Sequence, residues 1–94
     1  MVKIDCHMHV NGRHHQWGWS GNDCIIEAAD KLGIDQLCVS IPTVRGIPTI
    51  DEVRENNDDV ITMMKRYPER ILGYCYICPG HRESIDEISR CLDA

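Results

Sequence analysis

The chain has 94 residues, of which 43% are hydrophobic and 27% are charged, and its formal net charge is -5. This balance is typical of a globular domain and excludes a disordered segment. Acidic residues outnumber basic ones 15 to 10, and no basic stripe is present to attract a phosphate backbone, so we expect no nucleic-acid partner.

The first predicted element is a short strand near residues 2–6. The polar, glycine-containing stretch 11–22 after it is predicted to be a loop. A helix is predicted next, with Asn22 or Asp23 as its cap and Gly33 at its end. Its apolar residues recur at i, i+1, i+4 and i+7, which is one helical stripe: Ile25, Ile26, Ala29 and Leu32.

A second strand is predicted near residues 36–41 and is ended by Pro42. Its nearly continuous apolar character is typical of a strand covered on both faces. Thr49 and Glu52 have the spacing of a capping box, which predicts the start of a short helix. A further helical stripe precedes Pro68, and it consists of Val60, Ile61, Met64 and Tyr67.

The apolar run 71–78 predicts a third strand, and Ile85, Ile88 and Leu92 then mark a third helix. The alternation of strands and helices favours parallel βαβ units with right-handed connections. Three strands leave the outer edges of the sheet open, so self-association through these edges is one expectation.

The candidate site lies at the end of the first strand, where His7 and His9 are two residues apart. Alternate residues of a strand project to the same face, so the two imidazoles should converge. Such a pair can bind a divalent metal, most readily zinc. The plainer interpretation is that both are ordinary polar residues at a strand end.

Two stretches of the sequence resemble a known family. Ile4-Asp5-Cys6-His7-Met8-His9 resembles the opening signature of the amidohydrolase superfamily. Residues 57–79, with Tyr67-Pro68-Glu69-Arg70-Ile71-Leu72-Gly73 at their centre, resemble the amidohydrolase-related branch of metal-dependent hydrolases and decarboxylases. Together the two stretches extend the resemblance over essentially the whole chain.

The resemblance implies that residues 1–94 are a partial amidohydrolase domain, namely the first three βα units of a (β/α)8 TIM barrel that is incomplete in this chain. It assigns His7 and His9 as ligands of a divalent metal, most often zinc. It also implies a general-base aspartate beyond residue 94. A typical barrel has about 250 residues, so we expect an N-terminal fragment that is inactive alone.

The implied function is hydrolysis by a metal-activated water, or metal-assisted decarboxylation, of a small carbonyl or carboxylate substrate. His14 and Trp17 lie in the first βα loop and Arg45 in the second. In a barrel such loops surround the active site, so these three side chains are candidate substrate contacts. The alternative is that they only pack against neighbouring loops or face solvent.

Six cysteines permit other interpretations. Cys75 and Cys78 have CxxC spacing, which suggests a small Cys/His metal-binding or redox module. A strand context argues against it, because residues three apart on a strand face opposite sides. No apolar run is long enough to cross a bilayer and no signal peptide is evident, so we expect no membrane partner, a cytoplasmic location and reduced thiols. A non-catalytic fragment remains the third alternative.

Overall fold

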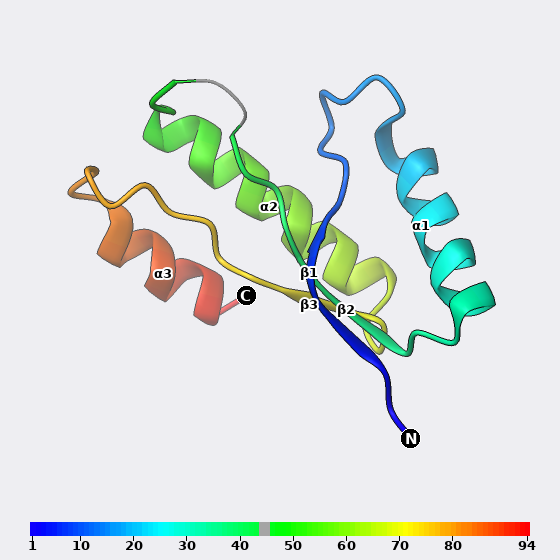
Figure 1. Ribbon diagram of the computed structural model, residues 1–94. Coiled ribbons are helices and arrows are strands. Elements are labelled where there is room, and N and C mark those ends of the chain that lie inside the picture. Colours follow the sequence, from blue (N-terminus) through cyan, green and yellow to red (C-terminus); the bar gives the residue numbers. More distant parts are fainter. Residues whose placement is uncertain (44–45) are drawn as a thin grey trace.

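The computed structural model describes residues 1–43 and 46–94, and its strands and helices alternate along the chain (Figure 1). The three strands are parallel and lie in the order β1-β2-β3. The predicted alternation and parallel pairing are therefore confirmed. The elements are β1 (Ile4–His9), α1 (Gly18–Leu32), β2 (Gln36–Ser40), α2 (Ile50–Arg66), β3 (Ile71–Gly73) and α3 (Ser84–Leu92).

The prediction of a TIM-barrel segment is wrong. Among residues 1–43 and 46–94, the strands form one open three-stranded sheet, in which β1 and β3 each pair only with β2. A barrel requires the first and last strands to hydrogen-bond to each other, which in this class takes eight tilted strands. The described residues instead form an α/β domain with one sheet and three helices, and self-association through its edges stays a prediction.

The hydrophobic core lies between α1, α2 and one face of the sheet. Leu37 and Val39 of β2 are 2% and 0% exposed and belong to one buried cluster with residues of both helices. On the other face of β2, Cys38 is 8% exposed, so the central residues of β2 are buried on both faces, as predicted, whereas Leu72 of β3, opposite Cys38, is 42% exposed. The buried core consists of Val10, Ile26, Ala29, Leu37, Val39, Ile41, Val60, Met63 and Ile71.

The third strand is shorter than predicted, because β3 ends at Gly73 although apolar residues continue to residue 78. The cause is Asn57 of α2. Its side-chain oxygen accepts a hydrogen bond from the backbone N–H of Tyr76 (2.9 Å), and its amide donates to the Tyr76 carbonyl (2.8 Å). These bonds satisfy the backbone as a neighbouring strand would, so the chain leaves the sheet toward α2.

The predicted capping residues are found at the end of α1 and at the start of α2. Gly33 ends α1 with a left-handed φ of 69°, and the Thr49 hydroxyl accepts from the Glu52 N–H (3.2 Å), as predicted. The predicted start of α1 is wrong, because the helix begins at Gly18, and Asn22 lies inside it and is 1% exposed. Its amide pairs with the backbone of Asn11 instead of capping the helix.

The predicted short helix at Thr49 and the stripe before Pro68 belong to the single helix α2. Figure 1 shows α2 between α1 and α3. In α3 the predicted apolar stripe faces away from the domain, since Ile85 and Leu92 are 75% and 79% exposed while Glu87 is 1% exposed. None of the described helices has the length and apolar character that a membrane span requires.

Candidate functional site

The two predicted metal ligands lie side by side at the carboxyl end of β1. The ring centroids of His7 and His9 are 5.3 Å apart, the rings are perpendicular, and both residues are exposed. Strand β1 is irregular between Asp5 and Met8. Asp5 is opposite Leu37 whereas Met8 is opposite Val39, so β1 contains one extra residue, a β-bulge. The bulge redirects the side chains next to it.

The surroundings of His9 suit a metal ligand. Its Nδ1 lies 3.2 Å from the backbone carbonyl of Ser40 and 3.3 Å from the Ser40 hydroxyl. A carbonyl oxygen only accepts, so this contact favours a proton on Nδ1 and leaves the lone pair on Nε2 pointing outward. Metal-binding histidines use the same arrangement, with the second ring nitrogen bonded to a carbonyl. The donor set of His7 and His9 therefore fits a zinc-like ion.

Two imidazoles do not complete a coordination sphere. Zinc is usually four-coordinate in proteins. In the described ranges 1–43 and 46–94, no group of three or more His, Cys, Asp or Glu side chains is arranged to bind a metal. The described residues therefore bring together two imidazoles, which are fewer donors than a four-coordinate protein site uses.

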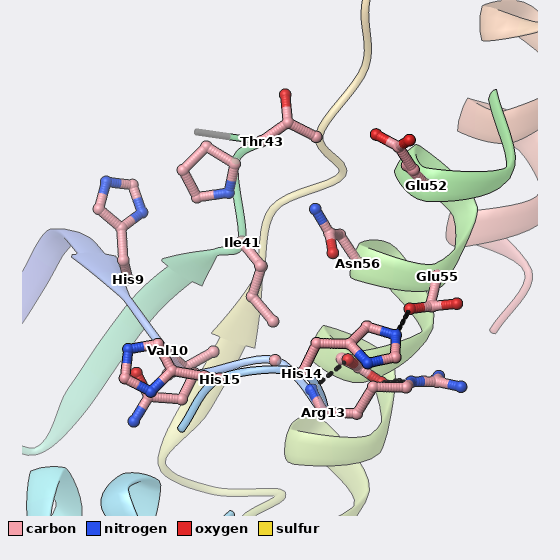
Figure 2. Close-up of a pocket in the computed structure, with 14 residues that line it drawn as sticks. His9, Val10, Arg13, His14, His15, Ile41, Thr43, Glu52, Glu55 and Asn56 are labelled. Carbon is pink, nitrogen blue, oxygen red and sulfur yellow. Dashed lines mark hydrogen bonds and ion pairs between the residues drawn. The ribbon is translucent and has the colours of Figure 1, made fainter. Parts of the chain in front are cut away.

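A cavity of about 540 Å³ opens beside His9 (Figure 2). It lies between the loop after β1, the end of β2 and one side of α2. This volume is in the range of pockets that bind small molecules. The residues that line it are His9, Val10, Asn11, Gly12, Arg13, His14, His15, Ile41, Pro42, Thr43, Glu52, Glu55, Asn56 and Asp59.

An ion pair between the half-exposed Arg13 and the buried Asp59 connects the loop after β1 to α2. The Asp59 side chain is 2% exposed and accepts from Arg13 through Nε (2.9 Å), a terminal nitrogen (2.7 Å) and the backbone N–H (2.8 Å). The Asp59 carboxylate raises the pKa of Arg13 above its ordinary value. Both guanidinium nitrogens contact the same oxygen, Oδ1, and the backbone N–H bonds to Oδ2. These charge-assisted contacts hold the loop after β1 against α2.

The predicted substrate contacts have different positions. His14 lines the cavity and its Nε2 contacts the Glu55 carboxylate. Trp17 is 64% exposed, precedes α1 and does not line the cavity. Arg45 lies outside the described residues. His14 alone of the three is therefore brought to the site by the described part of the chain.

The CxxC motif is not in a strand, because β3 ends before Cys75. The expectation that Cys75 and Cys78 face opposite sides of a strand is therefore wrong. The Cys75 thiol instead lies 3.7 Å from the Asn57 amide, and all six cysteines are free. Burial raises the pKa of the Cys91 thiol to about 12, with further contributions from Cys75 and Glu87. Cys91 is therefore protonated at neutral pH, and a protonated thiol is a poor nucleophile and metal ligand.

The α2 side of the cavity was not predicted from the sequence. Glu52, Glu55, Asn56 and Asp59 occur at i, i+3, i+4 and i+7, which is one face of a helix. That spacing was a usable signal for a polar stripe. Which neighbour the stripe faces depends on the Arg13–Asp59 pair, a contact between residues 46 positions apart.

No family model matches this chain, and neither the curated proteins nor the solved structures include a significant match.

Proposed function

We propose that the chain provides the histidine pair of a metal-dependent hydrolase or decarboxylase active site of the amidohydrolase type. His7 and His9 are the metal ligands in this proposal, and zinc is the ion. The substrate is a small carbonyl or carboxylate compound that occupies the cavity beside His9. A cytoplasmic location is part of the proposal, since free thiols such as the six in this chain persist in a reducing compartment.

The observation that carries the proposal is the contact between His9 Nδ1 and the Ser40 carbonyl. It orients one ring of an adjacent pair so that Nε2 is available. The resemblance of residues 4–9 to the amidohydrolase signature gives independent support. The cavity supports a small-molecule substrate, because His9 belongs to its wall.

The residues of the chain would bind and orient the reactants. His7 and His9 would hold the ion with neutral imidazoles, and Ser40 would keep the His9 ring in place through its carbonyl. A bound divalent ion would supply polarisation of the substrate oxygen and a lower pKa for water. His14 and Glu55, on the far side of the cavity, would contact the substrate away from the ion.

The test is a calorimetric titration of zinc into the intact chain after treatment with a chelator. We expect one zinc per chain in the wild type and loss of that binding in the double variant His7→Ala/His9→Ala. His81→Ala is the matched control, because it removes an imidazole that lies outside β1 and outside the cavity wall. The control should bind zinc like the wild type.

Undiminished zinc binding in the double variant would overturn the proposal. Cys75→Ser/Cys78→Ser should have no effect on zinc binding. If that variant alone lost zinc, the site would belong to the cysteines, as in the Cys/His module alternative.

A further inference from the structure

The cavity beside His9 has two chemically different sides (Figure 2). Glu52, Glu55 and Asn56 approach it from α2, whereas His9 and His15 approach it from the chain at and after the end of β1. Apolar groups, among them those of Val10 and Ile41, lie between them. A ligand that fits this arrangement has an apolar body and different polar groups at its two ends.

The charge of the α2 side is negative. Asp59 does not contribute to it, because the guanidinium group of Arg13 pairs with this carboxylate. Glu52 forms no side-chain hydrogen bond or ion pair with any residue in the described part of the chain, and Glu55 contacts His14, whose side chain is 80% exposed. The Glu52 carboxylate is therefore available to a ligand, and Glu55, one helical turn away, would exchange its exposed His14 contact for a ligand cation.

We propose that the cavity binds a small molecule that carries a cationic nitrogen, a primary ammonium or an amidinium group. The nitrogen donates hydrogen bonds to Glu52 and Glu55, and the body of the molecule packs on Val10 and Ile41. Hydrogen bonds between charged groups are the stronger ones, so the carboxylates select the cation against a neutral molecule of equal size.

This inference deepens the proposed function by naming the substrate class, an amine-bearing carbonyl or carboxylate compound. It rests on the proposed function only for the end of the substrate that faces His9. The cation site itself requires no metal, because its groups are Glu52 and Glu55 of α2.

The experiment compares benzylamine, benzyl alcohol and benzoate, which have similar size and differ in charge. Each is titrated into the isotope-labelled intact chain with a chelator present, and amide NMR shifts are followed at Val10, Ile41 and Asn56. We expect benzylamine to bind most tightly. Glu52→Gln/Glu55→Gln should weaken its binding about tenfold, whereas Glu27→Gln, at an exposed position of α1, should leave it unchanged.

Equal binding of the three probes, or no binding at millimolar concentration, would overturn the proposal. A preference for benzoate would also overturn it. Because the chelator removes metal, the result is independent of the zinc titration. Loss of zinc binding with retained benzylamine binding, or the reverse, therefore shows which of the two proposals fails.

Discussion

Replacing Glu87 with glutamine should destabilise the domain in a pH-dependent way. Glu87 is 1% exposed and accepts two hydrogen bonds from Arg90, both 2.8 Å, and one from the Asn57 amide (2.9 Å). The bonds from Arg90, followed by that from Asn57, outweigh burial and lower the Glu87 pKa from 4.5 to about 2. The network ties α3 to α2 through a carboxylate.

The magnitude follows from the difference in proton affinity between the folded and unfolded chain. At about 1.4 kcal/mol per tenfold change, a pKa that falls from 4.5 to about 2 is equivalent to about 3 kcal/mol. Arg90 is 41% exposed, so screening by water reduces this to about 2–3 kcal/mol. Because the folded pKa is the lower one, the stabilisation is complete above pH 4.5 and disappears as the pH falls toward 2.

The assay is urea unfolding followed by circular dichroism at pH 7 and at pH 3. Glu87→Gln should lose about 2–3 kcal/mol at pH 7, and its difference from the wild type should shrink to roughly half or less at pH 3. Glu83→Gln, exposed just before α3, is the control and should behave like the wild type at both pH values. A Glu87→Gln variant within about 0.5 kcal/mol of the wild type at pH 7, or an equal difference at both pH values, would refute the reasoning.

Two further substitutions test the N-terminal cap of α2 and the packing of α2 against β3. Thr49→Ala removes the hydroxyl that accepts from the N–H three residues on (3.2 Å), so it should cost about 1 kcal/mol and lower the melting temperature by about 4–8 °C, with recovery in Thr49→Ser. Gly73→Ala would place a Cβ 2.6 Å from both Val60 Cγ1 and Met64 Sδ, so it should cost about 1–3 kcal/mol in urea unfolding. Gly80→Ala, which meets no atom within 4 Å, is its control, and equal stability of the two glycine variants would contradict the close approach of β3 to α2.

The features that sequence analysis predicted correctly depend on local chemistry. Gly33 ends α1 because a left-handed residue is needed there, and Thr49 starts α2 because its hydroxyl reaches a backbone N–H of the first turn. The parallel sheet followed from the alternation of strand and helix patterns. Each of these inferences required only neighbouring residues or the order of the elements.

The errors arise where a polar side chain bonds to a distant part of the chain. Asn57 ends β3 early by bonding to Tyr76. Asn22 lies inside α1 and bonds to the backbone of Asn11 in the preceding loop instead of capping the helix. In α3 the contacts of Glu87 turn the charged side of the helix toward α2 and the apolar stripe toward solvent. The barrel prediction failed because the order of elements does not determine whether a sheet closes.

The candidate site divides in the same way. The spacing of His7 and His9 predicted that the rings lie together, although the bulge in β1 was not foreseen. The α2 side of the cavity was missed because acidic residues such as Glu52 are also common at helix starts, where the helix dipole favours them. Two long-range contacts, Arg13 with Asp59 and His14 with Glu55, bring that side of α2 to the loop after β1.

X-ray absorption at the zinc edge of the zinc-loaded chain tests the central claim most directly, because it identifies the ligand atoms. The proposal predicts a shell of nitrogen and oxygen at about 2.0–2.1 Å with imidazole scattering, as expected for His7 and His9 completed by light atoms. A sulfur shell at about 2.3 Å would contradict it and would assign the metal to the cysteines.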